Sequence, residues 1–170
     1  MTKGANRLTV CLRDEEPKWH ALKFDVGTCC EEALRASFYV AGEIEMKGEV
    51  SILLSSDTSV ARLNRKYRGL EGPTNVLSFP SGMGRSDLNA EIQPLLGDIV
   101  VAFETVVEEA EAAHISTQAH LAHMVVHGAL HLLGFDHQAE EEAQVMERLE
   151  VQSLQRLGLV SPYLASPLKG

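Results

Sequence analysis

The chain has 170 residues, 45% of them hydrophobic, and a formal net charge of −9 at pH 7. This length predicts a single domain over residues 1–170 that buries one apolar core. No apolar run approaches the ~20 residues of a membrane-spanning helix, and the first residues hold no apolar secretory segment, so we expect a cytoplasmic protein without a membrane partner. The acidity argues against general affinity for nucleic acid, because phosphate binding needs local positive charge.

The first half of the chain predicts three strands and two helices. Compact or alternating apolar runs indicate strands, periodic apolar positions indicate helices, and glycines after them mark helix ends. In chain order we expect a strand over Arg7–Leu12, a polar turn through Pro17, a helix from about Thr28 to Ala41, a strand over Glu49–Leu54, a helix capped by Ser55, Ser56 or Asp57 and ended by Gly69, and a strand over Thr74–Phe79 stopped by Pro80.

The second half predicts one more strand and three helices. The region Ser81–Pro94 is rich in turn-forming residues, and we expect a loop there that borders the functional site. The later elements are a strand over Gly97–Ala102 and helices over Glu104–Ala113, from a cap at Ser116 or Thr117 to Leu133, and over Glu140–Leu157. Strands mixed with helices in this order favour a small α+β or α/β sheet with helices packed on it.

The three cysteines, Cys11, Cys29 and Cys30, are odd in number and two of them are adjacent. This argues against a disulfide framework and for a reducing compartment. Cys29 and Cys30 open a helical pattern, so we expect them to be core or surface thiols rather than metal ligands.

The segment HGALHLLGFDH (127–137) holds three histidines at a spacing that suits a metal site. On a helix, His127 and His131 project from one face because they are four residues apart. Gly134 can adopt the left-handed conformation that ends a helix, and the turning chain can carry His137 back over that face. Three imidazoles and one open position are typical of a catalytic zinc, so we predict one zinc ion per chain. Such a zinc lowers the pKa of water or polarises a phosphoryl oxygen.

This spacing equals that of the metzincin zinc proteases, which makes a zinc metallopeptidase one alternative. Those enzymes place a glutamate, their general base, directly after the first histidine, where this chain has Gly128. A peptidase using that machinery would therefore lack its base.

Taken with LNRKYRGLEGPTNVLSFP (63–80) and LGDIVVA (96–102), the histidine segment resembles the YbeY family of bacterial metal-dependent endoribonucleases that act in ribosomal RNA maturation. The resemblance runs from about Val50 to Tyr163 and keeps the order of the three motifs. It implies an α+β fold with a mixed four-stranded sheet, about five helices, and the zinc-site helix packed on the sheet. It also implies a single-strand-specific endoribonuclease that acts at the 3′ end of small-subunit ribosomal RNA and in ribosome quality control. The partners it implies are ribosomal RNA and the ribosome or small-subunit proteins. A second alternative is therefore a non-catalytic ribosome-assembly factor, whose structural zinc would have a fourth protein ligand.

Arg68 is the candidate for stabilising the phosphoryl transition state, alongside His127, His131 and His137. A guanidinium fits non-bridging phosphoryl oxygens bidentately, although by itself this arginine has the pattern of a surface residue. The resemblance places the family's functionally important arginine at this position. Arg62, Arg65 and Lys66 form a basic stretch with it, and we expect them to be surface charges that could contact the RNA backbone.

Three further residues are candidates for contacts behind the metal ligands. A metal-bound imidazole usually donates its second N–H to a carboxylate or carbonyl. Asp136 and Asp98 could accept that bond or act as general base, and each could instead cap a turn. His123 lies four residues before His127 and could extend a polar stripe toward the substrate, with core packing as the alternative. The sequence leaves open whether water or the 2′-hydroxyl of RNA is the nucleophile.

Overall fold

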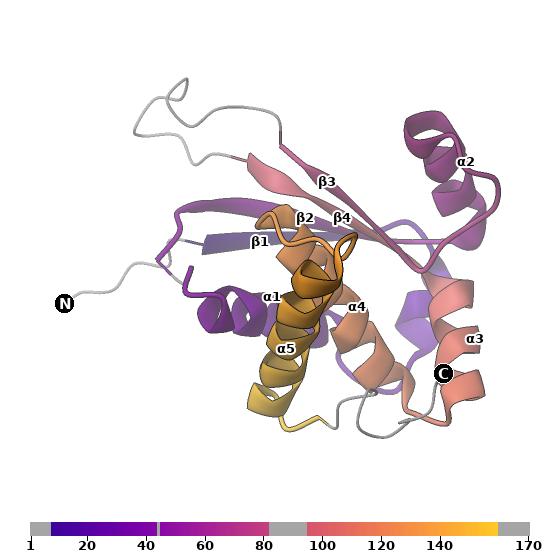
Figure 1. Cartoon of the computed structure of the whole chain (residues 1–170). Helices are drawn as coiled ribbons and strands as arrows, with labels where there is room; N and C mark the ends of the chain where they lie inside the picture. The colour runs from indigo at the N-terminus through magenta and orange to yellow at the C-terminus, as the bar shows by residue number, and fades with distance from the viewer. Residues whose placement is uncertain (1–7, 44, 82–94, 160–170) are drawn as a thin grey trace.

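The computed structural model describes residues 8–43, 45–81 and 95–159. Within these ranges the sheet has four strands, in the order β1 (Leu8–Asp14), β2 (Gly48–Ser55), β4 (Leu95–Ala102) and β3 (Val76–Pro80). The first three run parallel, and β3 pairs antiparallel with β4. The mixed four-stranded sheet is therefore confirmed, and β3 lies at one margin of it (Figure 1).

In the described part of the chain, five α-helices accompany the sheet, as expected. They are α1 (Val26–Val40), α2 (Asp57–Arg68), α3 (Phe103–Ala113), α4 (Thr117–Leu132) and α5 (Glu140–Arg156). The expected turn through Pro17 is wrong in detail, because residues Pro17–Ala21 form a short 3-10 helix, η1, that buries Trp19. The expected loop over Ser81–Pro94 lies, after its first residue, outside the described part of the chain.

Side-chain caps mark where α2 and α4 begin, and a glycine marks where α2 ends. The Ser56 hydroxyl accepts from the Ser59 N–H at the start of α2, and the Ser116 hydroxyl accepts from the Ala119 N–H at the start of α4. At the end of α2, Gly69 has φ 69°, a left-handed conformation that favours glycine. The predicted helix ends were therefore correct here, because a few polar or glycine residues determine them locally.

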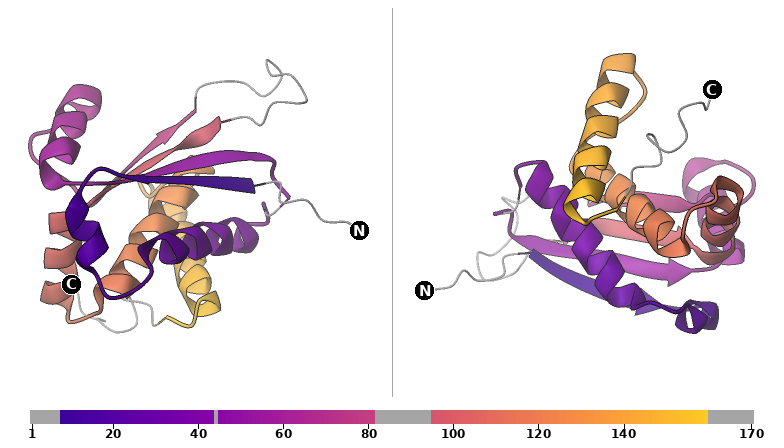
Figure 2. Two further views of the ribbon diagram at one scale, coloured as in Figure 1. Left: turned by 180° about the vertical axis from the view of Figure 1, so that it is seen from behind. Right: turned by 90° about the horizontal axis from the view of Figure 1, so that it is seen from below.

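The core lies between the sheet and the helices on one of its faces. Helix α4 is buried along most of its length because α1, α3, α5, β3 and β4 all pack on it. Figures 1 and 2 show α1 and α4 below the sheet and α2 beside the other face. A second, smaller cluster under α2 contains Val60, Leu77, Val100 and Ala102. The sheet therefore separates two sides of the molecule, and α4 lies on only one of them.

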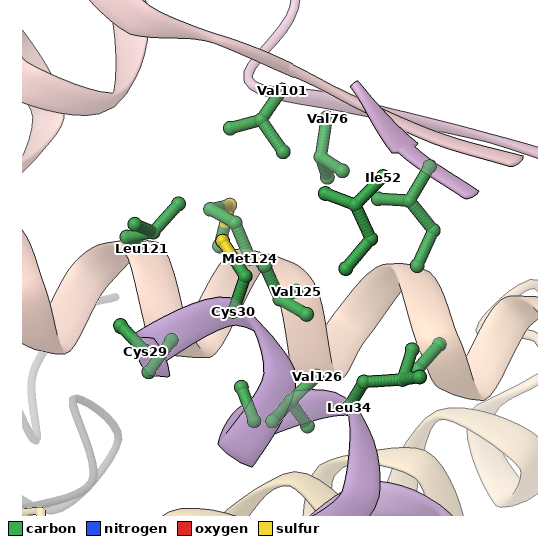
Figure 3. Close-up of a cluster of buried hydrophobic side chains, with 14 of the residues drawn as sticks. Cys29, Cys30, Leu34, Ile52, Val76, Val101, Leu121, Met124, Val125 and Val126 are labelled. Atoms are coloured by element: carbon green, nitrogen blue, oxygen red, sulfur yellow. The ribbon is translucent and has the colours of Figure 1, made fainter. Parts of the chain in front are cut away.

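Cys29 and Cys30 belong to the core, where α1 meets α4 (Figure 3). Burial raises the pKa of the Cys29 thiol to about 12 and raises that of Cys30 further, so both stay protonated. The prediction of core thiols is confirmed. Within the described residues, no helix is both long and apolar enough to cross a membrane.

Candidate metal centre

The end of α4 positions the three histidines. His127 and His131 occupy its last two turns, and the helix ends at Leu132 with Leu133 as its C-cap. Gly134 has φ 100°, its N–H donates to the His131 carbonyl at 3.0 Å, and the Phe135 N–H donates to the Leu130 carbonyl at 3.0 Å. This glycine turn reverses the chain, as a C-terminal helix cap does. It brings His137 back beside the other two imidazoles.

The three side chains converge on one point. One ring nitrogen from each histidine lies within 4.8 Å of the other two. The Nε2 atoms of His127 and His131 are 3.2 Å apart, and the ring centroids of the three pairs are 4.7 to 5.5 Å apart. No fourth His, Cys, Asp or Glu atom of the described residues joins the group. The donor set fits a divalent cation held by three imidazoles with one position left open.

The electrostatics of His131 favour the form that binds metal. Burial lowers the pKa of His131, and the neighbouring His127 and His137 lower it further. A lowered pKa keeps the imidazole neutral at neutral pH, with a free lone pair. The site is therefore prepared to accept a cation.

Glu150, on α5, stands behind the triad. Its carboxylate is buried, with 1% of the side chain exposed, and its Oε2 contacts Nδ1 of His127. Burial alone would raise the pKa of Glu150, but hydrogen bonds from His123 and His127 outweigh it and lower the pKa to about 2. An ionised acceptor at Nδ1 keeps the proton of His127 on that atom and directs the Nε2 lone pair toward the other histidines.

A cavity of about 460 Å³ opens beside the triad, and Arg68 lines it. Arg68 is the last residue of α2, and its Nη1 donates to Oδ1 of Asn64 at 3.3 Å. Asn64 is buried and donates to the Gly72 carbonyl at 2.9 Å, which anchors the chain that leaves α2. Arg68 and the three histidines thus line one common cavity.

A family model described as Endoribonuclease YbeY matches residues 14–158. The chain belongs to this family. The Endoribonuclease YbeY of Methylocella silvestris is 41% identical over 150 residues, which cover 88% of this chain and 82% of that one. The Endoribonuclease YbeY of Bartonella bacilliformis is 39% identical over 156 residues, which cover 92% of this chain and 97% of that one.

The solution structure of TM1509 from Thermotoga maritima has a TM-score of 0.55 to this chain and 24% sequence identity, covering 88% of this chain and 92% of its own. This likeness supports the α+β fold alone. Together, the comparisons confirm the YbeY family and, as its activity class, the metal-dependent endoribonuclease that the sequence motifs implied.

The chain has Gly128 where a metzincin protease has its general base, and packing explains why. A Cβ added to Gly128 would lie 3.0 Å from Oγ of Ser78 and 3.1 Å from Cγ2 of Ile99. Helix α4 approaches β3 and β4 so closely that a side chain at this position would crowd Ser78 and Ile99. A glutamate there would have to displace these neighbours, so packing favours the glycine and the peptidase alternative still lacks its general base.

His123, Asp136 and Asp98, the three residues predicted to contact the metal ligands, lie in different surroundings. His123 is buried, and its Nε2 contacts Oε1 of Glu150 at 3.1 Å, so it shares that carboxylate with His127. Asp136 lines the cavity, and its Oδ1 accepts the His137 N–H at 2.7 Å. It therefore acts as a turn residue that fixes the chain at the third histidine.

Asp98 does not line the cavity of the triad, so its role beside the ligands stays a prediction that the geometry does not support. Ile99 faces Gly128, so the preceding side chain points to the opposite side of the sheet, because strand side chains alternate. There Asp98 lines a separate groove with Arg13 and Tyr67. The sequence places Asp98 close to a core strand but does not say which face it occupies.

The remaining basic residues lie on the outer surface of α2. Arg62, Arg65 and Lys66 are exposed. Arg65 is 3.8 Å from Oε2 of Glu71, and the Lys66 ammonium lies 5.2 Å from the centroid of the Tyr67 ring. Of the four basic residues of this stretch, Arg68 is the one that lines the cavity of the triad.

Sequence reasoning missed Glu150 as a functional residue. The signal was available in the periodicity of α5, where Met146 and Leu154 are buried four residues on either side of Glu150. An acidic residue in the middle of an apolar helix stripe needs a buried partner, because an unpaired buried carboxylate is costly.

Proposed function

We propose that this chain is a zinc-dependent endoribonuclease that cleaves single-stranded RNA in the cytoplasm. Its role is maturation of the 3′ end of small-subunit ribosomal RNA and ribosome quality control, with the ribosome or its small-subunit proteins as partners. Family membership supports the activity class. The single observation that carries the proposal is the common cavity, in which Arg68 and the three histidines face one space.

The identity of the metal is argued from the ligand atoms. Neutral imidazole nitrogens suit zinc, and a three-ligand set with an open position is typical of catalytic rather than structural zinc. The cation, when bound, supplies Lewis-acid stabilisation of charge on phosphoryl oxygens. His127, His131 and His137 would hold it, and Glu150 would keep the Nδ1 proton of His127 in place.

Arg68 acts on the substrate directly in this proposal. Its Nη1 donates to Asn64, so the guanidinium is oriented from one side and its other N–H groups remain able to donate. Negative charge gathers on the non-bridging oxygens during phosphoryl transfer, and a guanidinium stabilises that charge more strongly than it binds the uncleaved strand. Arg68 would therefore affect turnover more than binding.

The test compares metal content and cleavage of a single-stranded RNA by the native chain and three variants. We expect His131→Ala to lose the zinc and the cleavage together. Arg68→Ala should keep the zinc and lose about 100-fold or more in kcat, because one donor to transition-state charge is removed. Lys66→Ala, exposed on the same helix, is the matched control and should weaken RNA binding only mildly.

Two outcomes would contradict the proposal. Cleavage that persists in metal-free His131→Ala would place the activity outside the histidine cluster, and intact turnover in Arg68→Ala would remove Arg68 from the reaction. Analysis of the product ends separates the two nucleophiles. A cyclic phosphate indicates attack by the 2′-hydroxyl, and a linear phosphate end without a cyclic precursor indicates attack by water.

A further inference from the structure

Among the residues that the structure describes, β3 is an edge strand of the sheet, and no other strand pairs with one row of its main-chain groups. At its two ends, the Ala102 N–H donates to the Asn75 carbonyl at 3.0 Å and the Ser81 N–H donates to the Leu96 carbonyl at 3.1 Å. Hydrogen-bonded and non-hydrogen-bonded pairs alternate along an antiparallel ladder. These two bonds therefore fix which residues of β3 face β4 and which face outward.

Val76 lies opposite Val101, and Ser78 lies opposite Ile99. Both are non-hydrogen-bonded pairs of the ladder, which alternate with the hydrogen-bonded ones. The N–H and C=O groups of Val76 and Ser78 consequently point away from β4, toward the free edge of the sheet. Pro80, two residues after Ser78, also occupies an outward-facing position. Proline has no backbone N–H, and it is tolerated there because β4 accepts no hydrogen bond from that position. The free edge thus offers two N–H donors with a carbonyl beside each.

This edge forms one wall of the cavity that contains the histidines. The lining of the cavity includes Val76, Ser78 and Pro80 from β3 and Arg68 from α2. The Ser78 hydroxyl donates to the Gly128 carbonyl at 3.0 Å, which ties β3 to α4 one residue after His127. A strand that occupied the cavity would therefore lie along β3 and pass the triad.

We propose that the free edge of β3 binds the sugar–phosphate chain of single-stranded RNA. The Val76 and Ser78 N–H groups donate to phosphate oxygens, and their carbonyls accept from ribose 2′-hydroxyls. This inference rests on the proposed function, and it names how the substrate is aligned. The outward N–H and C=O groups of a strand recur every second residue, about 6.8 Å apart. Each nucleotide of RNA likewise presents a phosphate oxygen as acceptor and a ribose 2′-hydroxyl as donor. A deoxyribonucleotide chain lacks the donor.

An extended peptide is the other chain that pairs with a sheet edge, and the cavity favours RNA over it. Peptide addition gains affinity from a long ladder and specificity from pockets for alternate side chains. Here Pro80 ends the row of donors after Ser78, and much of the cavity wall is polar, with Arg68 and the three imidazoles in it. A phosphate chain matches the cation and the two N–H donors.

Amide exchange in the native full-length chain tests the contact directly. The zinc-loaded protein is mixed with a single-stranded RNA at low temperature, where cleavage is followed on a gel. Exchange of the Val76 and Ser78 amides should slow on RNA binding, because their N–H groups become hydrogen-bonded. The Leu77 and Phe79 amides are the internal controls, since they face β4 and are protected before RNA is added.

A pair of variants at one position tests the energetic contribution. Ser78→Pro removes the outward N–H together with the hydroxyl, whereas Ser78→Ala removes the hydroxyl alone. Relative to Ser78→Ala, Ser78→Pro should bind RNA about tenfold more weakly, the effect of one charge-assisted hydrogen bond. At the linkage that contacts Ser78, the RNA phosphate is replaced by an uncharged methylphosphonate. This replacement should weaken RNA binding to Ser78→Ala but should not weaken RNA binding to Ser78→Pro any further.

The outcomes separate this inference from the proposed function. If the native chain cleaves RNA while the Val76 and Ser78 amides exchange as fast as before, the edge does not bind the substrate and the inference is overturned. Protection of the same amides by an unfolded peptide but not by RNA also overturns it. Should the zinc-loaded chain cleave no RNA at all, the proposed function fails first. The exchange measurement needs no variant, so it decides even if Ser78→Pro does not fold.

Discussion

Glu150 shows how one buried residue connects two helices to the metal site. Its two carboxylate oxygens contact His123 and His127 on α4, while its main chain belongs to α5. The ionised carboxylate compensates for its burial by two hydrogen bonds to imidazoles. The orientation of His127, and with it the geometry of the triad, therefore depends on where α5 packs.

We expect Glu150→Gln to weaken zinc binding by about 10- to 100-fold, because a neutral amide holds the Nδ1 proton of His127 less firmly. The measurement is zinc affinity by competition with a chelator. Glu108→Gln, an exposed glutamate on α3, is the control and should keep the native affinity. Equal zinc affinity in the two variants would show that Glu150 has only a packing role.

The residues of the site differ in how far the sequence could predict them. His127, His131 and His137 were predictable because helix periodicity and one glycine place them within a short local segment. Glu150 and Asp98 were not, since their positions depend on how distant elements pack and on which sheet face a side chain occupies. The family resemblance, rather than any local pattern, identified Arg68.

At the scale of elements, the contact between α4 and the sheet controls the site. Gly128 allows the helix to lie against Ser78 and Ile99. The bounds of α4 follow from its cap at Ser116 and its glycine turn, and both could be predicted from sequence. The strand order β1-β2-β4-β3 could not, because it depends on pairing between segments far apart in the chain.

Gly128→Ala tests this contact. The added methyl group would overpack the interface at a cost of about 1–3 kcal/mol, while better helix propensity returns about 1 kcal/mol. We therefore expect a net loss of about 1 kcal/mol in the free energy of unfolding, measured by urea denaturation. In a Ser78→Ala background the same change should cost less, because the nearest atom, Oγ of Ser78, is gone. An identical cost in both backgrounds would show that Ser78 does not limit the space.

At the scale of the whole molecule, acidic charge dominates, with a basic stretch at the end of α2. The net charge of −9 would repel RNA on average, whereas Arg68 and its neighbours attract it locally. The sequence predicted this contrast in full, because it depends only on composition and on residues close together in the chain.

The stability of the metal-free chain should fall as the pH falls, in two ranges. The pKa of His131 is lowered from its ordinary value of 6.5, so the unfolded state takes up its proton first and stability declines below about pH 6.5. The pKa of Glu150 is lowered from 4.5 to about 2, so its contribution, on the order of 3 kcal/mol, is present above pH 4.5 and is lost as the pH falls toward 2.

Thermal unfolding between pH 7 and pH 2 measures both ranges. In Glu150→Gln, the loss of stability between pH 4.5 and pH 2 should disappear, and the loss below about pH 6.5 should remain. A native chain whose melting temperature is constant from pH 4.5 to pH 2 would contradict the role given to the Glu150 carboxylate. Zinc should shift the upper range, since protons compete with the metal for His131.

The free margin of β3 also brings a hazard. An unpaired edge strand can pair with the same strand of another copy of the chain, and such edge-to-edge pairing is a common start of aggregation. The brevity of β3 and the missing N–H of Pro80 limit how far that pairing could extend. The surface that is open for a ligand is therefore also the one through which the protein would self-associate, and any occupant of this margin protects its solubility.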